Sequence, residues 1–584
     1  MPRVSLFSLA LLLAAGSLAR AEINSPAELF PRTTLAYAEL SKPSTIVDNA
    51  IAHPLYQHVT TLDAYQQALK SNQYKQFLAG VSFAETQLGE KWRPALDSLA
   101  GGGVAIGLDA KHEGVGIAVR SKNAESVQKL VDTIVGLVKL GAGGDEKKTQ
   151  VKTAEYRGVK AHRIDEMILG VVDNWLLVSN KGDLLKEMVD RAQGDGESLA
   201  QSKNFQAAKK AVEGEPHGWG YLDVESLRTS GAAKNVFENQ SDNILVELLF
   251  GGLQSVARNT PYLTASVFIE SEQARVQLSA PFAADWAPEE RTFYFGPEAK
   301  GRAPELLKVE ERILAIGTYR NVAEMWLRAG DLFGERVNDQ LAAADSVLTT
   351  FFSGKDFAED ILGAVEPEFQ FIVARQSYAK ELPTPAIKLP SFALVTKLKD
   401  PKMRRELRRT FQSLIGFINV TGAMNGQPQF DLDMEVVGDA ELVTASYSPD
   451  ADEENLRAAR INYNFSPAVG FVGEHFIVSS TRDLAAKLSA AAGKSAANAS
   501  SANTALHAGL APLQRILVDN RSHLVAQNML EDGNTKEQAE QQMDIIFGLL
   551  AAIQDASLKL ESGDGQIQLA LTINSATEQK KQTK

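Results

Sequence analysis

The sequence predicts an α+β protein with two related halves, each a largely antiparallel sheet covered by helices. The first observation is a strand–helix unit that occurs twice, at 174–185 and, 300 residues later, at 474–485. In both copies an apolar run suited to a buried strand leads into an amphipathic helix pattern. The second observation is that short apolar runs joined by turn residues surround this unit, as in hairpins. The third is that these elements recur in the same order in both halves.

The start of the helix carries the same signals in both copies of the unit. Asn180 and Ser480 are residue types that cap helices, and we expect them at the N-cap position. Asp183 and Asp483 follow in the first turn, where a carboxylate faces the positive end of the helix dipole. Matching signals at matching places predict an internal duplication.

The first half, 22–280, shows strand and helix patterns in a regular order. Helical patterns up to about residue 99 follow the first strand and are broken at Pro54 and Pro94. Asn123 is expected to cap a helix with one apolar face, and a later helix is expected at 243–257. The strands expected in this half are 35–40, 103–108, 114–120, 154–164 with a turn at Arg157-Gly158, 168–172, 218–224, 263–271 and 274–280.

The second half, 305–575, repeats this order in diverged form, after a segment at 281–304 whose Pro, Ala and charge predict a linker. The opening β-α-β-β-α-β order predicts a ferredoxin-like unit with added strands. An Ala/Ser-rich loop is expected at 490–505 and a disordered polar tail at 576–584. The matching segments are 313–317 for the first strand, 369–374 and 391–398 for the first hairpin, Asp400-Pro401 for the helix start at Asn123, 543–556 for the later helix and 567–569 for the last strand.

Residues 1–21 have the pattern of a secretory signal peptide. Arg3 supplies the charged start, 6–15 the apolar stretch, and Ala19-Arg20-Ala21 the small-x-small cleavage site. No other uninterrupted apolar run reaches transmembrane length. The mature protein is therefore expected to be periplasmic or extracellular and to have no transmembrane anchor, while peripheral membrane contact stays open.

Composition excludes several classes of protein. The chain has 584 residues, too many for one core, so several domains are expected. It contains no cysteine, which excludes disulfides, thiol catalysis and thiolate metal sites. Its formal net charge is −13, and loss of Arg3 and Arg20 with the leader would make it more negative. A strongly acidic chain repels phosphate backbones, so nucleic acid is not an expected partner.

No coherent catalytic set is visible. Ser126 to Lys129 fits S-x-x-K and Ser241-Asp242-Asn243 fits S-D-N, the motifs of penicillin-binding enzymes and serine β-lactamases. No K-T-G follows, and the spacing is unlike that of the compact enzymes, so a chance match is favoured. The eight histidines lack metal-ligand spacing and are interpreted as structural or solvated. No catalytic, cofactor-binding or metal residues, and no cofactors, are therefore expected.

The strongest local charge feature is the basic run at 402–409. On a helix, Arg404, Arg405, Arg408 and Arg409 form one stripe, and an apolar stripe lies beside it. Such a run is most often the solvated face of a core helix. The alternative is a site for an anionic envelope polymer or a lipid headgroup.

Several short segments of the sequence together resemble the DUF3352 family of exported bacterial proteins of unknown function. The resemblance is good over about 29–280 and faint in the second half, where Tyr156-Arg157-Gly158 has no clear counterpart. It implies a fold and an extracytoplasmic location, and it implies no catalytic residues. The segments are Leu35-Ala36-Tyr37, 155–159, 175–180, 198–205 and 218–223.

These observations lead to a hypothesis about function. We expect an exported, non-enzymatic protein that binds an envelope partner or ligand through its surface or through a groove between the halves. Two alternatives stay open. One is an extracytoplasmic hydrolase whose site is assembled from distant residues. The other is a carrier of a lipid or another apolar ligand, which would require a large apolar cavity between sheet and helices.

Overall fold

A computed structural model describes the chain in two compact units, which are treated separately below. The residues it describes are 23–141, 151–231, 240–352, 354–378, 384–425, 429–447, 461–494, 500–563 and 565–576, so the predicted leader and most of the predicted tail lie outside them. Unit 1 comprises Met1–Asp48, Asn72–Leu227 and Pro261–Ser266. Unit 2 comprises Asn49–Ser71, Arg228–Thr260 and Val267–Lys584. Three elements have residues in both units: α1 (Pro43–Ala52), α9 (Val224–Thr229) and β9 (Tyr262–Ile269).

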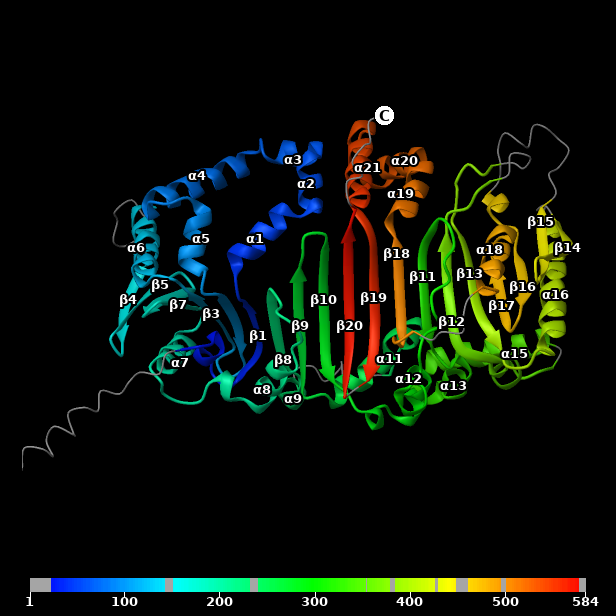
Figure 1. The fold of residues 1–584 in the computed structure, drawn as a ribbon, viewed down its shortest axis with the longest axis horizontal. Helices are drawn as coiled ribbons and strands as arrows, with labels where there is room; N and C mark the ends of the chain where they lie inside the picture. The colour runs from blue at the N-terminus through cyan, green and yellow to red at the C-terminus, as the bar shows by residue number, and fades with distance from the viewer. Residues whose placement is uncertain are drawn as a thin grey trace, which may run out of the picture. The chain divides into compact units, whose positions relative to one another are not determined.

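Unit 1 contains an antiparallel sheet in which the strands run in the order β4-β5-β6-β7-β3-β2-β1-β8 (Figure 1). Short apolar runs and tight turns produce this pattern, as the sequence predicts. The bounds are β1 (Thr34–Leu40), β2 (Val104–Asp109), β3 (Gly114–Arg120), β4 (Val151–Tyr156), β5 (Val159–Ile164), β6 (Met167–Val172), β7 (Trp175–Ser179) and β8 (Gly218–Asp223).

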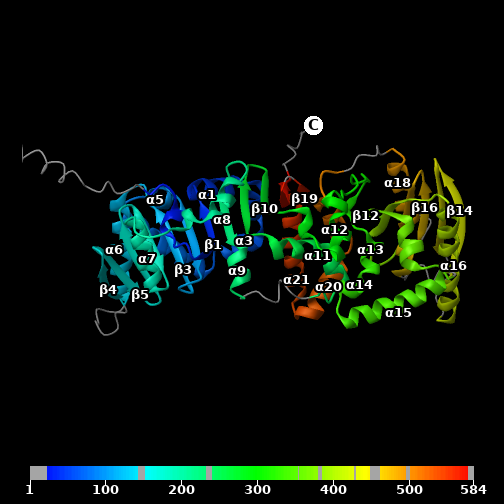
Figure 2. The same ribbon diagram turned by 90° about the horizontal axis from the view of Figure 1, so that it is seen from below.

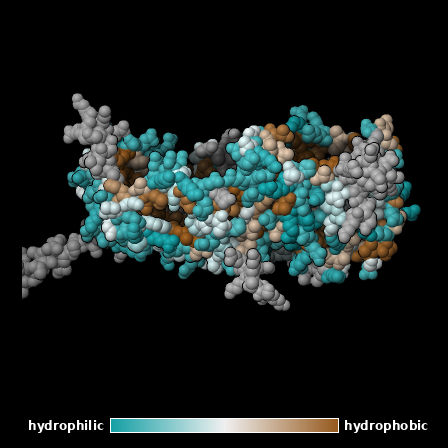
Figure 3. Space-filling model, turned by 90° about the horizontal axis from the view of Figure 1, so that it is seen from above, coloured by the Kyte–Doolittle hydropathy of each residue, from teal (hydrophilic) through white to brown (hydrophobic). Residues whose placement is uncertain are grey.

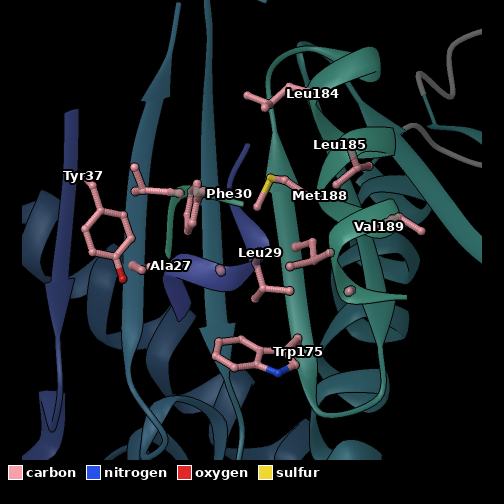
Figure 4. Packing of buried hydrophobic residues seen from close by; sticks show 14 of the residues in the cluster. Ala27, Leu29, Phe30, Tyr37, Trp175, Leu184, Leu185, Met188 and Val189 are labelled. Atoms are coloured by element: carbon pink, nitrogen blue, oxygen red, sulfur yellow. The ribbon is translucent and has the colours of Figure 1, made fainter. Parts of the chain in front are cut away.

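Helices cover both faces of the unit 1 sheet. The main core lies under α7, where Leu184, Leu185 and Met188 are buried against the sheet. Figure 4 shows Met188 reaching toward Phe30. A smaller core lies under α6 on the other face, around Val131. The helices are η1 (Pro26–Leu29), α4 (Asn72–Leu88), α5 (Trp92–Ala100), α6 (Ala124–Gly141), α7 (Gly182–Ala192), η2 (Leu199–Gln201) and α8 (Lys203–Lys210).

Unit 2 contains a longer antiparallel sheet, in the order β10-β20-β19-β18-β11-β12-β13-β17-β16-β15-β14. Figure 2 shows α16 and α18 on opposite sides of its strands. The strands are β10 (Gln273–Pro281), β11 (Arg312–Tyr319), β12 (Val365–Ala374), β13 (Ser391–Leu398), β14 (Phe430–Val437), β15 (Ala440–Tyr447), β16 (Ala468–Val472), β17 (His475–Ser479), β18 (Thr504–Gly509), β19 (Ile553–Gly563) and β20 (Gln566–Ser575).

The helices of unit 2 include two that pack on its sheet like the two helices of unit 1. Leu484 and Leu488 of α18 are buried on one face, and Phe411 and Ile415 of α16 on the other. The helices are α2 (Pro54–Thr61), α3 (Asp63–Ala68), α11 (Ile244–Asn259), η3 (Ala284–Trp286), η4 (Glu289–Arg291), α12 (Thr292–Phe295), η5 (Pro297–Ala299), α13 (Val322–Leu327), α14 (Ala329–Leu332), α15 (Glu335–Phe351), η6 (Phe357–Ile361), η7 (Leu362–Ala364), α16 (Met403–Met424), η8 (Ile461–Asn464), α18 (Arg482–Ala492), α19 (Leu510–Asp519), α20 (Arg521–Asp532) and α21 (Lys536–Ala551).

The strand orders of the two units correspond position by position. The order β4-β5-β6-β7-β3-β2-β1-β8 has the counterpart β14-β15-β16-β17-β13-β12-β11-β18. The register also shifts at the same place, between Thr34 and Ala36 in β1 and between Arg312 and Leu314 in β11. Register position can therefore be compared between the units.

The structure corrects the predicted helix caps. The N-cap residues are Lys181 and Thr481, one position after Asn180 and Ser480. The Asn180 Oδ1 accepts a hydrogen bond from the Val115 backbone N–H at 2.8 Å, and the Ser480 Oγ accepts one from the Phe392 N–H at 2.8 Å. Both side chains turn to the neighbouring strand because its edge amide needs an acceptor.

Four further expectations differ from the structure. The ferredoxin-like prediction is wrong, because β1 pairs only antiparallel, with β2 and β8, whereas a split βαβ unit has parallel neighbours. The helix predicted at 543–556 is shorter at its C-terminal end: α21 ends at Ala551, and β19 begins at Ile553. The predicted loop at 490–505 includes the end of α18 and the start of β18, and 495–499 lie outside the described residues. The predicted linker contains η3, η4, α12 and η5.

Candidate ligand-binding site

Helix α16 covers only part of its face of the unit 2 sheet. Phe411 and Ile415 pack on Val443 of β15 and Val469 of β16, and all four are buried. Beyond the helix, on β13 and β17, the same face stays open. There Phe392, Leu394 and Val478 are 45%, 43% and 39% exposed.

The open residues belong to one continuous apolar row across the sheet. Phe371 of β12 pairs with Leu394 of β13, Leu394 with Val478 of β17, and Val478 with Val469 of β16. Paired residues lie on the same face because side chains alternate along each strand. The row therefore begins at solvent-exposed residues and continues into the buried core under α16.

The open end of the row forms the wall of a groove of about 590 Å³. Ile418 of α16 closes one side, and Phe430 and Tyr447 stack nearby with ring centroids 3.9 Å apart. Figure 3 shows hydrophobic surface lying in hollows of the upper face of the molecule, framed by hydrophilic residues. The groove is lined by Phe371, Phe392, Leu394, Ile418, Phe430, Tyr447, Asn462, Phe465, Pro467, Val478, Ser479 and Ser480.

The polar groups of the groove lie together beside Phe392. The Ser479 Oγ donates to the Thr481 carbonyl at 2.8 Å, and Ser480 accepts from the Phe392 N–H. Both hydroxyls are thus engaged with the backbone. Among the described residues that line the groove there is no histidine and no carboxylate. The arrangement can hold an apolar chain with a polar group at one end, and it offers no acid–base pair.

Unit 1 has the same open apolar row. Ile106 of β2 pairs with Ile117 of β3, Ile117 with Val178 of β7, and Val178 with Leu169 of β6. Leu169 is buried under α6, whereas Ile106 is 45% exposed. One helix leaves part of the sheet face uncovered in both units.

The structure does not bring together the S-x-x-K and S-D-N motifs. Lys129 pairs with Glu125 at 3.2 Å along its own helix, and the Ser241 Oγ donates to the Asn243 carbonyl at 2.9 Å. Ser126 and Ser241 belong to different units. Each motif is occupied by local helix and turn contacts.

The basic run lies on α16, and two of its arginines have partners. Arg404 donates to the Gly473 carbonyl and Arg408 to the Glu441 carboxylate. Met403 is buried, and Lys355 pairs with Glu406. These contacts favour the interpretation of the run as the outer face of a core helix.

Two histidines contact polar groups outside the groove. The His112 Nδ1 lies 2.7 Å from the buried Asp109 carboxylate, which also accepts from the His112 backbone N–H and from Thr33. This carboxylate closes the turn between β2 and β3. His53 lies 3.3 Å from the Ser575 hydroxyl, and burial lowers the pKa of its imidazole.

The described residues contain neither a group of metal-ligand side chains nor a membrane-spanning helix. In that part of the chain, no three His, Asp or Glu side chains are grouped so that they could hold a metal ion. The described helices include none with the length and hydropathy needed to cross a bilayer.

The sequence was then compared with known proteins. The model of the DUF3352 family, "Protein of unknown function", matches residues 72–252. This match confirms the resemblance to DUF3352 over that range. The segment at 35–37, which also resembles the family, precedes the matched range. No curated protein matched the chain.

Two solved structures that are similar to this chain are distant from it. Crystal form III of TP0453 is 7% identical, with a TM-score of 0.25, and the match covers 44% of this chain and 80% of that one. Crystal form IV is 8% identical, with a TM-score of 0.26, and the match covers 45% and 83%. Values this low transfer no function.

Four groove residues, Phe371, Phe392, Leu394 and Val478, were predicted as strand residues and not as a site. A signal was nevertheless present at 391–398, where Phe392 and Leu394 alternate with Ala393 and Val395. Apolar residues at every position require cover on both faces of a strand. Among the described residues, α16 is the helix that packs on this side of the sheet.

Proposed function

We propose that this protein is an exported, non-enzymatic binding protein that holds an apolar chain, such as the acyl chain of a lipid, in the groove of unit 2. The observation that carries the proposal is the open apolar row, Phe371, Leu394 and Val478, beside α16. An exposed apolar surface of this kind marks a binding site more often than a free surface.

The energetics support an apolar ligand. Each methylene group buried in the groove gains about 0.8 kcal/mol. Ordering the chain and losing its translational freedom oppose this gain, so several methylenes are needed for stable binding. The Ser480 and Asn462 end of the groove supplies polar groups for the head of an amphiphile.

The matched strand orders support a second part of the proposal, that the two units descend from an internal duplication. Under this history, each unit inherited a sheet with one face incompletely covered by its helix. Unit 2 alone acquired the aromatic residues Phe371, Phe392 and Phe430 that deepen the groove. Ile106 and Ile117 stand in unit 1 where Phe371 and Leu394 stand in unit 2.

Binding of cis-parinaric acid, a fluorescent fatty acid, tests the proposed function. The wild-type protein should enhance its fluorescence, and palmitate should displace it. Leu394→Asp should weaken binding by at least about tenfold, because it places a charge in the apolar wall and removes the apolar contact of Leu394 with the ligand.

The matched control is Val436→Asp. Val436 lies on β14 of the same sheet, is 74% exposed and does not line the groove. Its substitution should leave the affinity unchanged. Equal affinities for the wild type and Leu394→Asp, or no fluorescence enhancement by the wild type, would contradict the proposal.

A further inference from the structure

A second hollow lies on the opposite, α18 face of the unit 2 sheet. Its volume is about 1070 Å³. It is bounded by the segment at 297–307, by the ends of β12 and β13, and by the turn at 472–475 between β16 and β17. Unlike the apolar groove, it is lined by charged side chains of both signs.

The register places four of these side chains in neighbouring pairs. Tyr319 of β11 pairs with Glu368 of β12, and Lys397 of β13 pairs with His475 of β17. Val395 and Ile477, two residues along the same strands, are buried in the core under α18. Because side chains alternate, Lys397 and His475 lie on this α18 face as well.

Acidic and basic groups are sorted onto adjacent strands. Glu366 and Glu368 line the hollow from β12, and Lys397 and Lys399 line it from β13 and its end. Neighbouring strands are about 4.8 Å apart, and the Lys397 ammonium is close enough to Glu368 to act on the pKa of its carboxyl. Among the described residues, no ion pair joins Lys397 to either glutamate. Both signs are thus available to a ligand.

Burial disfavours the charged forms of two of these groups. Burial raises the pKa of the Glu368 carboxyl, the nearby Glu366 raises it further, and Lys397 and Lys399 oppose the rise. Burial and then Lys397 lower the pKa of the His475 imidazole, against a smaller opposite effect of Glu474. Partly desolvated charges interact more strongly with a ligand than exposed ones.

Unit 1 fills the corresponding place. Arg120 and Trp175 stand at the register positions of Lys397 and His475, and the guanidinium lies 5.5 Å from the ring centroid. Gly101, Gly102 and Gly103 precede β2 where the two glutamates stand in β12. A Cβ on Gly102 would lie 2.6 Å from the Arg120 Cγ, so the arginine stem packs directly on this glycine. In unit 2 a smaller ring and two carboxylates replace this packing.

We propose that the hollow binds a small zwitterion, with its ammonium group against Glu366 and Glu368 and its anionic group against Lys397 and His475. The site is separate from the apolar groove, since the sheet lies between them. Charge complementarity carries the assignment: carboxylates and ammonium groups line one hollow from neighbouring strands, and among the described residues no ion pair joins Lys397 to either glutamate.

Calorimetric titration of the purified full-length mature chain with glycylglycine tests this assignment. N-acetylglycylglycine retains only the negative charge, and glycylglycinamide only the positive one. Glycylglycine should bind at least about tenfold more tightly than either, because each of the other two probes loses the charge-assisted hydrogen bonds of one end. Glu368→Gln and Lys397→Met should each remove most of this advantage.

A blocking variant and matched controls complete the experiment. His475→Trp restores the residue of unit 1, Trp175, and should abolish binding while the fold is retained in circular dichroism. Glu359→Gln and Lys402→Met alter exposed charges outside the hollow and should leave binding unchanged. Equal affinities for the three probes, no heat with glycylglycine at millimolar concentration, or full binding by His475→Trp would overturn the assignment.

Discussion

Replacement of Glu247 by alanine is expected to destabilise unit 2 by about 3–5 kcal/mol, because it leaves a buried guanidinium without its partner. Glu247 is 1% exposed and Arg291 is 3% exposed. The Arg291 Nε donates to Oε1 of Glu247 at 2.7 Å, and an Nη2 contact to Oε2 measures 3.3 Å. The side-chain amide oxygen of Gln254, Oε1, accepts a hydrogen bond from Arg291 at 2.9 Å. This amide is neutral and cannot compensate the charge of the guanidinium.

The control for this prediction is Glu289→Ala, which removes an ion pair with Arg328 on the surface. It should cost less than about 1 kcal/mol, because exposed pairs contribute little. Denaturant-dependent hydrogen exchange of α11 peptides measures both effects within unit 2. A double substitution of Glu247 and Arg291 by methionine should recover most of the loss. Equal costs for Glu247→Ala and Glu289→Ala would contradict the proposed role of burial.

Replacement of Trp175 by alanine is expected to destabilise unit 1 by about 3–5 kcal/mol, the usual cost of emptying a large aromatic site in a core. Trp175 is 2% exposed and belongs to the core under α7. Figure 4 shows it beside Leu29, below the side chains of α7. The surrounding strands and η1 cannot collapse into the space, because their backbones are fixed by the ladder.

Trp92→Ala is the matched control, since an arginine also lies over that ring. The Arg93 guanidinium is 5.4 Å from the Trp92 centroid, but Trp92 is 42% exposed. Its removal should cost less than about 1 kcal/mol. Guanidinium denaturation, followed by hydrogen exchange of β7 peptides, distinguishes the two. A similar small loss for Trp175→Ala would show that the core under α7 does not depend on this ring.

The sequence predicted the strands of unit 1 and some of those of unit 2 because their signals are local. Apolar runs bounded by turn residues such as Arg157-Gly158 specify strand and turn without distant partners. The caps show the limit of local signals. Asn180 and Ser480 are good cap residues by type, but their side chains bond to the amides of Val115 and Phe392, which lie on strands distant in sequence.

The segment at 281–304 could not be interpreted correctly from composition alone. Its Pro, Ala and charged residues are typical of a linker, yet Phe293, Tyr294 and Phe295 are fully buried. Their environment is built by distant residues. Arg320 donates to the Tyr294 carbonyl and lies 3.4 Å from its ring centroid. Such partners leave no local pattern.

The candidate sites were also beyond local prediction, because each depends on what fails to cover a surface. Phe392 and Leu394 are ordinary core residues by type, and only the limited extent of α16 leaves them open. Lys397 and His475 are ordinary surface residues by type, and only the strand pairing places them together. His475, at the register position that Trp175 has in unit 1, was the sequence difference that lies at the hollow.

Native mass spectrometry of the protein purified gently from its own host tests the central claim most directly. The account predicts that the wild-type protein carries an amphiphile that is released on denaturation, and that Leu394→Asp, which lines the groove, carries none. Val436→Asp should retain the adduct. The same adduct content in the wild type and Leu394→Asp, whether both are bare or both are loaded, would contradict binding of an apolar chain in this groove.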